Sequence, residues 1–345
     1  MVVKVVFAPV ADGNPYQKLL SESLKKCHID VYKSSIFPKL SWLCKHHKDV
    51  EIIHIHWPSS LYRMGRLTFL RSMILVFRIL AAKTLGFRLV WTVHNILPHE
   101  SRTPFWDLFF RYFFIRFGDG IICHCEFALS EIQRRFGNAK KTAVIPHGNY
   151  IGCYPNKPSR EVARNKLGLP HEGIVFLSFG LLREYKNITE LVHQLARLDR
   201  DVTLVVAGRG EVDSSLLETE QIGKVGLKFF NDYIPNAEVP FFFAAADIML
   251  APYRNILTSG AVILSLSMGT PVIAPALGCL PELMVNGGGI LYDPSKSGAL
   301  RRAIEKSFYC NLEEMSQTAE SIADLLGWDR LGASTAKFYK DIVDL

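Results

Sequence analysis

The sequence has no long, uncharged apolar run of the kind that crosses a membrane. Among its 345 residues, the nearest candidate is Leu67–Leu85, which carries Arg71, Arg78 and Lys83. A membrane-spanning helix needs about 20 predominantly apolar residues, so we do not expect one here. The apolar run at the N-terminus is short and leads directly into a turn, unlike that of a signal peptide.

Motifs typical of metal sites and of nucleic-acid binding are also scarce. The seven cysteines are odd in number and form no C-x-x-C pair, so free thiols are expected and not a disulfide framework. His54 and His56 could share one strand face, but no further ligand spacing accompanies them, so a metal pair is disfavoured. The net charge is +7, yet no block of five Lys or Arg residues occurs, and we expect no nucleic-acid partner.

The sequence does contain a regular alternation of short apolar runs and helical patterns. Fully apolar strands joined by helices are typical of buried parallel sheets. Two successive series of such strands predict two doubly wound α/β domains. The first series is Val3–Ala8, Val50–His54, Leu89–Val93, Gly120–Cys123 and Thr142–Ile145. The second is Val175–Phe179, Thr203–Ala207, Leu227–Phe230, Ile248–Ala251, Val272–Ala274 and Gly289–Tyr292.

A stretch rich in proline and glycine separates the two series. Between His147 and Pro170 there is no clear periodicity, which is typical of a linker. We therefore expect a first domain over residues 1–155, a second over residues 171–325, and a C-terminal helix within residues 326–345. Ligands of open parallel sheets bind at the carboxyl ends of the strands, so the functional residues should lie in the loops that follow them.

One loop of the second series is suited to binding a diphosphate. Ser259 and Gly260 directly precede the helical run Ala261–Met268. The free backbone N–H groups and the dipole of a helix start attract anions. Ordinary N-capping by Thr258 or Ser259 is the alternative interpretation.

A second loop places two cations after the strand Val175–Phe179. Gly180 allows close approach of the backbone, and Arg183 and Lys186 follow it. Such cations can neutralise the charge on a departing nucleoside diphosphate. The alternative is a solvated helix start, although cations there oppose the helix dipole.

Taken in order, these segments resemble the family 4-like glycosyltransferases (glycosyltransferase group 1), which have the GT-B fold. That fold consists of two doubly wound Rossmann-like domains facing a central cleft. The resemblance is strongest over Ile174–Asp293. The segments that carry it are Phe179–Asn187, Val206–Gly210, Phe230–Pro252, Gly269–Ala274, Gly278–Glu282 and Asn286–Leu291. Trp328-Asp329-Arg330 resembles the start of the family's terminal helix, which crosses back to the first domain.

The resemblance implies that the second domain binds a GDP- or UDP-linked sugar, without a metal ion or another cofactor. Lys186 matches the family's phosphate-contacting lysine, whereas Leu181 occupies the usual arginine position and Arg183 is displaced from it. The backbone near Asn231–Ile234 is expected to face the base. The donor-binding residues so implied are Gly180, Asn231, Ile234, Tyr253, Thr258, Ser259, Gly260 and Glu282.

The sequence departs from the family at two positions. Retaining members carry two glutamates eight positions apart, and here those positions hold Ile256 and Leu264. The contacts to the donor sugar and the stereochemical outcome are therefore not inherited. This variant resembles exopolysaccharide hexosyltransferases and mannosyltransferases.

The first domain is implied to hold the acceptor. Asn14 and Tyr16 follow its first strand, and His56 and Trp57 follow its second, so these four are the expected acceptor contacts.

His94 lies where many family members have a sugar-contacting histidine, and histidine suits proton exchange near neutral pH. A structural histidine is the alternative. Glu100, on the same loop, is a second candidate base, although a loop carboxylate is often merely solvated. An inverting reaction needs a base from the acceptor domain, so we predict inversion with His94 or Glu100 in that role.

Two stretches of the first domain combine basic and large apolar residues. They are Arg63–Arg88 and Pro104–Phe117. Such helices suit an anionic membrane surface, and a thick buried helix layer is the alternative. We expect a cytoplasmic protein, peripheral on the inner face of the cell membrane.

The predicted activity is transfer of a hexose from a nucleoside diphosphate sugar to a hydroxyl group of a lipid-linked or polysaccharide acceptor. Two alternatives remain. One is a sugar-nucleotide epimerase of the same fold, and the other is a catalytically degenerate subunit that only binds sugar nucleotides.

Overall fold

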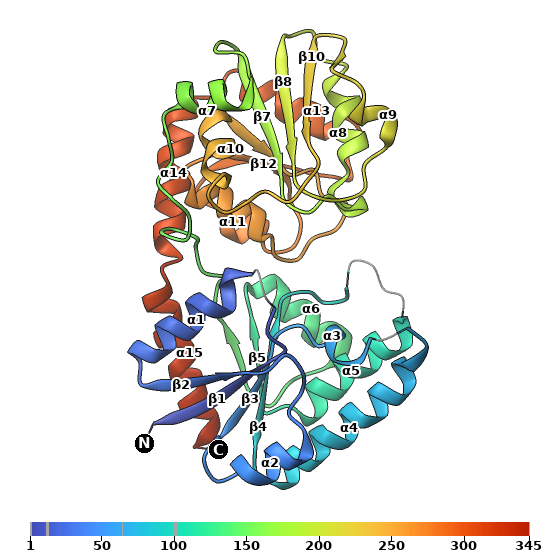
Figure 1. Ribbon diagram of the computed structural model, residues 1–345, viewed down its shortest axis with the longest axis vertical. Coiled ribbons are helices and arrows are strands. Elements are labelled where there is room, and N and C mark those ends of the chain that lie inside the picture. Colours follow the sequence, from blue (N-terminus) through green and yellow to red (C-terminus); the bar gives the residue numbers. More distant parts are fainter. Residues whose placement is uncertain (1, 12–13, 64, 99–102, 345) are drawn as a thin grey trace. The chain divides into compact units, whose positions relative to one another are not determined.

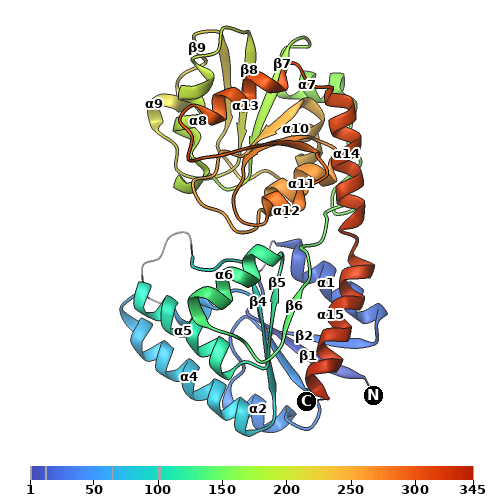
Figure 2. The ribbon, with the colours of Figure 1, turned by 180° about the vertical axis from the view of Figure 1, so that it is seen from behind.

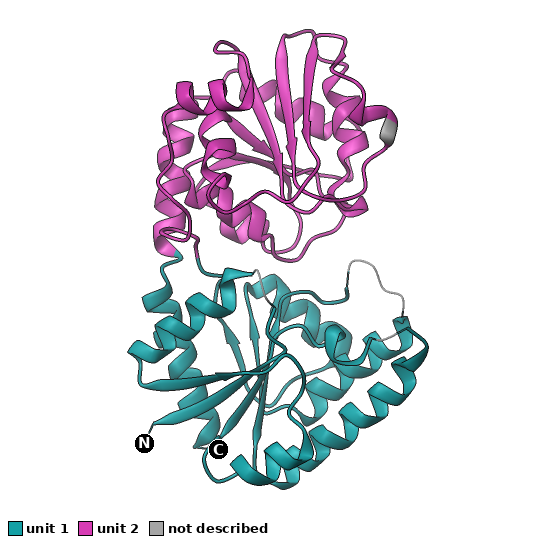
Figure 3. Ribbon diagram, in the orientation of Figure 1, with its two compact units in different colours: residues 1–148, 326–345 teal, residues 149–325 magenta. Residues whose placement is uncertain are grey.

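The computed structural model describes residues 2–11, 14–63, 65–98 and 103–344, with Ser214 described by its backbone only. The chain forms two compact units (Figure 3). Unit 1 comprises Met1–Gly148 and Leu326–Leu345, and unit 2 comprises Asn149–Leu325. The change of unit at Gly148 lies at the start of the expected linker, seven residues before the expected end of the first domain at residue 155.

Unit 1 is built on a six-stranded parallel sheet with the strand order β2-β1-β3-β4-β5-β6. The strands are β1 (Val3–Ala8), β2 (Ile29–Lys33), β3 (Ile52–Ile55), β4 (Arg88–Val93), β5 (Gly120–Cys123) and β6 (Thr142–Val144). The helices are α1 (Pro15–Lys26), α2 (Leu40–His46), α3 (Ser59–Tyr62), the 3-10 turn η1 (Gly65–Leu67), α4 (Thr68–Thr84), α5 (Pro104–Phe117), α6 (Glu126–Phe136) and α15 (Trp328–Val343).

Strand β2 was not among the predicted strands. It lies at the edge of the sheet, and only Ile29 of its five residues is buried. An edge strand exposed in this way needs no continuous apolar run. The periodicity that identified the central strands is therefore missing from it.

The last helix of the chain belongs to unit 1. Helix α15 packs along α1 on one face of the sheet, and α4 and α5 lie side by side on the other face (Figures 1 and 2). Tyr339 and Ile342 of α15 share a buried core with Phe7 and Leu20. A Cβ atom on Gly148 would lie 2.3 Å from the indole of Trp328, so α15 packs directly against the end of the first segment.

Unit 2 is built on a seven-stranded sheet with the order β13-β12-β11-β7-β8-β10-β9. Its strands are β7 (Ile174–Phe179), β8 (Val202–Ala207), β9 (Gln221–Ile222), β10 (Val225–Phe230), β11 (Ile248–Leu250), β12 (Val272–Pro275) and β13 (Gly289–Tyr292). Its helices are α7 (Arg160–Leu167), η2 (Glu184–Lys186), α8 (Ile188–Leu195), α9 (Ser214–Leu217), α10 (Val239–Ala245), α11 (Gly260–Ser267), α12 (Leu280–Leu283), α13 (Ala299–Ser307) and α14 (Leu312–Leu325). The short β9 pairs antiparallel with β10, an exception to the expected parallel sheet.

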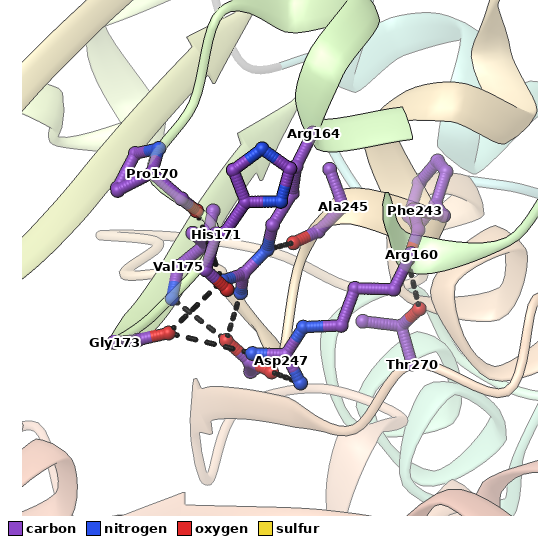
Figure 4. Close-up of polar contacts among 10 residues, drawn as sticks. All are labelled: Arg160, Arg164, Pro170, His171, Gly173, Val175, Phe243, Ala245, Asp247 and Thr270. Carbon is purple, nitrogen blue, oxygen red and sulfur yellow. Dashed lines mark hydrogen bonds and ion pairs between the residues drawn. The ribbon is translucent and has the colours of Figure 1, made fainter. Parts of the chain in front are cut away.

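A buried ion pair holds α7 to the amino ends of β7 and β11 (Figure 4). Arg164 is fully buried, and its guanidinium lies 2.8 Å from the carboxylate of Asp247. That carboxylate also accepts the N–H of Val175 at 2.7 Å and pairs with the exposed Arg160 at 2.9 Å. The guanidinium donates further hydrogen bonds to the carbonyls of Ala245, Pro170, His171 and Gly173. The pair lies at the end of the sheet away from the loops expected to bind ligand.

Replacing Arg164 with Met should destabilise unit 2 strongly. The change leaves the carboxylate of Asp247 and several carbonyls without their main donor, and breaking a buried pair in this way costs about 3–5 kcal/mol. Arg160→Met removes only the exposed partner and should cost about 1 kcal/mol or less. Urea unfolding of the two variants measures both effects, and equal costs would show that Arg164 has no special role.

Candidate functional site

Backbone loops at the carboxyl ends of β7 and β8 lie in direct contact. The N–H of Leu182 donates to the carbonyl of Arg209 at 2.9 Å. A Cβ atom on Gly208 would lie 2.3 Å from the carbonyl oxygen of Gly180, and one on Gly210 would lie 1.9 Å from that of Leu182. These glycines are therefore required for the loops to approach each other, and they fix the position of the loop that contains Lys186.

Lys186 is a nearly buried cation, with 4% of its surface exposed. Its Nζ donates to the carbonyl of Phe179 at 2.5 Å, and it would lie 3.0 Å from a Cβ atom on Gly180. No ion pair joins it to an acidic side chain in the described residues. Burial lowers the pKa of Lys186 from 10.5 to about 7.

Helix α11 begins beside the same ammonium group. A Cβ atom on Gly180 would touch both Lys186 Nζ, at 3.0 Å, and the Cβ of Ala261 in the first turn of α11, at 4.0 Å. Ser259 caps the helix by accepting the N–H of Val262 at 3.2 Å, and the hydroxyl of Tyr253 lies 2.8 Å from Ser259 Oγ. A positive helix end and a buried cation thus lie together, which is the arrangement of an anion site.

The side chains of the other residues expected to bind the nucleotide sugar are exposed, half-buried or bonded to residues other than Lys186 and the first turn of α11. Arg183 is exposed, unlike Lys186. Asn231 accepts the N–H of Gly210 at 3.1 Å, and the hydroxyl of Thr258 lies 3.4 Å from Cys279 Sγ. Ile234 is half-buried, and Glu282 is exposed on α12. The structure therefore brings together Gly180, Lys186, Ser259 and Gly260, with Tyr253 supporting the cap.

The two positions that carry glutamate in retaining family members are apolar and buried in this chain. Ile256 is 7% exposed and Leu264 is 5% exposed. Neither side chain can accept a hydrogen bond from a sugar or ribose hydroxyl.

In unit 1, five buried histidines lie in or just after the carboxyl ends of the successive strands β3, β4, β5 and β6. They are His54, His56, His94, His124 and His147. Tyr16 lies among them, with ring centroids 4.9 Å from His94 and 4.7 Å from His147. Trp57 stacks on His94 at 4.5 Å with an interplanar angle of 16°.

Three of these histidines form a hydrogen-bonded row. His56 Nδ1 lies 3.3 Å from His94 Nε2, and His94 Nδ1 lies 3.3 Å from His124 Nε2. His124 Nδ1 then lies 2.9 Å from the carbonyl oxygen of Ile145. We call His56, His94 and His124 the histidine row.

His54 and His147 have separate partners. His54 Nε2 lies 2.7 Å from Thr92 Oγ1, and its Nδ1 lies 2.5 Å from the hydroxyl of Tyr339 on α15. His147 Nδ1 lies 2.8 Å from the carbonyl oxygen of Gly148.

Burial keeps all five imidazoles neutral. It lowers the pKa of His54 and of His147 to about 3, and that of His124 to about 4. Burial and then the neighbouring histidines lower the pKa values of His56 and His94 well below 6.5.

The structure brings together most of the expected acceptor residues. Tyr16 and Trp57 each contact both His56 and His94. Asn14 caps α1 by accepting the N–H of Tyr16 at 3.0 Å. Glu100 lies outside the described residues. No group of three or more His, Cys, Asp or Glu side chains in the described part of the chain could hold a metal ion.

Sequence reasoning missed His124 and His147. His124 directly follows the strand predicted at Gly120–Cys123, and His147 lies two residues after the strand predicted at Thr142–Ile145. Since the carboxyl ends of neighbouring parallel strands meet at one edge of the sheet, a histidine after each of four strands was a usable signal.

The two stretches rich in basic and large apolar residues, Arg63–Arg88 and Pro104–Phe117, are partly buried in the core and partly exposed at the surface. Leu75 and Ile79 of α4 are buried, as are Phe110 and Phe114 of α5. Their other faces expose large apolar side chains, namely Phe69, Leu70, Met73, Ile74, Phe77, Leu80, Phe105, Leu108 and Tyr112. None of the helices in the described ranges has the length and apolar character needed to cross a bilayer.

Two family models match the chain. The model of Glycosyltransferase Family 4 matches residues 6–149, and that of Glycosyl transferases group 1 matches residues 173–308. Among solved structures, sucrose-phosphate synthase from Thermosynechococcus elongatus superposes with a TM-score of 0.75 at 16% identity, covering 99% of each chain. HepE of Anabaena in complex with UDP superposes with a TM-score of 0.73 at 20% identity, covering 99% of this chain and 100% of that one.

Two curated relatives are similar to the chain at 23% and 26% identity. A GDP-mannose:glycolipid 4-beta-D-mannosyltransferase of Xanthomonas campestris pv. campestris is 23% identical over 282 residues, which cover 77% of this chain and 71% of that protein. A D-inositol 3-phosphate glycosyltransferase of Streptomyces bingchenggensis is 26% identical over 241 residues, which cover 65% of this chain. The match spans about half, 53%, of that protein.

The two units, each a doubly wound α/β sheet, define a GT-B fold, as the sequence predicted. The chain belongs to the family 4-like glycosyltransferases (glycosyltransferase group 1).

The buried histidines should make the protein unstable in mild acid. Their folded-state pKa values lie below the unfolded value near 6.5, so the unfolded chain binds more protons at any pH between the two values. The free energy of unfolding should therefore fall as the pH drops from 7 to 5. Each histidine contributes a slope that approaches about 1.4 kcal/mol per pH unit. Urea unfolding at several pH values measures this slope, with the exposed His193→Gln as a control that should not change it. A stability that is flat from pH 7 to 5 would contradict the prediction.

Proposed function

We propose that this chain transfers a hexose from a nucleoside diphosphate sugar to a hydroxyl group, with the diphosphate bound by Lys186 and the first turn of α11. The observation that carries the proposal is the buried ammonium of Lys186, which no acidic side chain of the described residues neutralises. A buried cation is costly unless it is paired. A diphosphate supplies the missing negative charge.

The same groups assist the chemical step. When the bond between sugar and phosphate breaks, negative charge grows on the departing diphosphate. The Lys186 ammonium and the N–H groups at the start of α11 are already oriented toward that charge, so they stabilise the transition state more than the ground state. This arrangement needs no metal ion and no other cofactor.

The nucleoside diphosphate of the donor is proposed to be GDP or UDP. The name of the Xanthomonas relative specifies GDP-mannose, and the Anabaena structure contains UDP. The acceptor is proposed to be lipid-linked or a polysaccharide, since the name of the Xanthomonas relative also specifies a glycolipid.

Lys186→Met should abolish most turnover. The substitution keeps an unbranched side chain of similar length but removes the charge, and loss of such a stabilising group costs on the order of a hundredfold in kcat. Arg183→Met, which removes an exposed cation in the same loop, should cost less than tenfold. Kinetics with radiolabelled GDP-mannose and UDP-glucose test both variants. Near-normal turnover of Lys186→Met would remove the basis of the proposed site.

The affinity for the nucleotide sugar should fall as the pH rises above 7. The diphosphate of a nucleotide sugar does not titrate near neutral pH, whereas free Lys186, with a pKa of about 7, loses its charge there. The dissociation constant should rise by up to about tenfold per pH unit above 7. Lys186→Met should bind weakly and without this pH dependence. Calorimetric titration gives both constants, and a wild-type affinity that is constant from pH 6 to 8.5 would count against the assignment.

The same assays separate the alternatives. Conversion of the donor to an epimer without transfer would identify a sugar-nucleotide epimerase. Donor binding with neither epimerisation nor transfer would identify a catalytically degenerate subunit.

We further propose that the reaction inverts the anomeric configuration. The positions used by retaining members hold Ile256 and Leu264, both buried and apolar. An inverting reaction takes the acceptor proton with a group of the acceptor-binding unit, where His94 and Glu100 are the candidate residues. A carboxylate is already ionised at neutral pH, and the buried His94 is neutral and thus able to take up a proton.

NMR analysis of the product should therefore show an anomeric configuration opposite to that of the donor. His94→Ala or Glu100→Gln, or both, should lose most of the turnover. A product with the donor's own configuration would contradict inversion and leave His94 without a role as a base.

The exposed face of α4 is proposed to rest on an anionic membrane, at the inner face of the cell membrane in the cytoplasm. Phe69, Leu70, Met73 and Phe77 of this face are each more than a third exposed. Helix α4 carries Arg71 and Arg78 and no acidic residue, and its third cation, Lys83, is paired with Asp119. Apolar side chains and cations on one helix match the two parts of an anionic bilayer surface.

Vesicles of phosphatidylglycerol and phosphatidylcholine should bind the protein at low salt and release much of it at high salt. Phe69→Glu with Phe77→Glu should weaken binding at least tenfold, because each change removes apolar area and adds a repelled charge. Tyr309→Glu, at an exposed position of unit 2, serves as the control and should bind as the wild type does. Cosedimentation measures binding, and wild-type behaviour of the double variant would exclude α4 as the contact.

A further inference from the structure

At one end of the histidine row, a backbone carbonyl fixes which nitrogen of His124 carries the hydrogen. His124 Nδ1 faces the carbonyl oxygen of Ile145 at 2.9 Å, and a carbonyl can only accept. His124 Nδ1 therefore carries a hydrogen. Because burial keeps His124 neutral, its Nε2 carries a lone pair.

The orientation of His124 determines the orientation of the rest of the row. The lone pair of His124 Nε2 needs a donor, and His94 Nδ1 lies 3.3 Å away. His94 is neutral and donates from Nδ1, so its Nε2 is an acceptor. That nitrogen receives the hydrogen of His56 Nδ1, also at 3.3 Å. All hydrogens in the row thus point away from His56 and toward Ile145.

The row ends in an acceptor that has no donor. His56 is 1% exposed, and its Nε2 makes no hydrogen bond with any described residue. Leaving such a group buried and unpaired costs about 1–3 kcal/mol. Both nitrogens of His94, in contrast, are engaged by other histidines.

We propose that His124 is a positioning residue that fixes the tautomers of His94 and His56, so that His56 Nε2 accepts a hydrogen bond from a hydroxyl group of the sugar acceptor. This inference rests on the proposed glycosyl transfer. Within the histidine row, His56 Nε2 is then the receiving atom, and the role of base considered above for His94 passes to His56. Since both nitrogens of His94 are engaged by His56 and His124, His94 acts on the reaction only by orienting His56. A hydroxyl hydrogen-bonded in this way has its oxygen lone pairs free to attack the donor sugar.

The tautomers can be observed directly. In long-range proton–nitrogen NMR spectra of protein labelled with ¹⁵N-histidine, His94 and His56 should both carry the hydrogen on Nδ1. His124→Phe keeps a ring of similar size but removes the acceptor for His94, so both residues should shift toward the other tautomer. His54→Phe, a buried histidine outside the row, should leave both tautomers unchanged. A wild-type row with hydrogens on Nε2, or tautomers unaffected by His124→Phe, would overturn the positioning role.

Steady-state kinetics test whether His56 Nε2 accepts a hydrogen bond from the acceptor hydroxyl. His124→Phe and His56→Phe should each lower kcat by about tenfold or more, because a misplaced proton acceptor weakens acid–base assistance. The KM for the nucleotide sugar should stay constant, since the donor binds in unit 2. Wild-type kcat in His56→Phe would show that its Nε2 contacts no reacting hydroxyl.

Glycosyl transfer and the ordering of the histidine row by His124 can be tested independently. If no donor supports transfer, the proposed function falls, yet the NMR spectra still decide whether His124 orders the row.

Discussion

A single uncompensated charge determines much of unit 2. The ammonium of Lys186 is buried against the carbonyl of Phe179, and its pKa is lowered from 10.5 to about 7. Since the folded-state pKa lies below the unfolded value, the group disfavours folding below pH 10.5, with its full effect below about 7. The cost is of the order of 5 kcal/mol. The loops around this charge are held by glycine-dependent contacts, and the start of α11 beside it is capped by Ser259.

The opposite ends of the same strands hold a second buried cation, and this one is paired. Arg164 and Asp247 close the amino ends of β7 and β11 with a paired, fully hydrogen-bonded charge. At the amino ends of the strands, the buried charges of Arg164 and Asp247 neutralise each other. At the carboxyl ends, no acidic side chain of the described residues pairs with the buried charge of Lys186. Proteins commonly concentrate such unsatisfied groups at functional sites and compensate for them elsewhere.

Unit 1 handles buried polar groups in a different way. Its five histidines stay neutral, so the constraint is the direction of their hydrogens and not the balance of charge. A neutral imidazole has one donor and one acceptor, and a row of them can be satisfied in only one order once one end is fixed. The Ile145 carbonyl supplies that fixed end, and a single unpaired atom remains at the other.

Much of the fold was predictable because the central strands are fully apolar. Strands such as Val3–Ala8 and Gly120–Cys123 were placed to the residue, whereas the exposed edge strand β2 carried no such pattern. In the candidate site, Lys186 and Ser259 were identified from their position between strand and helix. The missing charge partner of Lys186 was not predictable, because burial and pairing depend on residues far apart in the sequence. His56 and His94 were predicted as site residues and His124 could have been, since each follows a predicted strand. The hydrogen bonds between them were not predictable, because they depend on how the three adjacent strands place the rings.

The position of α15 has a consequence for the order in which the chain folds during synthesis. Unit 2 is encoded by one continuous segment and can fold as soon as it leaves the ribosome. Unit 1 lacks one side of its core until α15 follows, about 180 residues after Gly148, which takes about 10–40 s at typical rates of translation. During that interval the apolar side chains of Phe7 and Leu20, which α15 later covers, face the solvent or a chaperone. The first half of this chain therefore cannot complete its core before the second half has been synthesised.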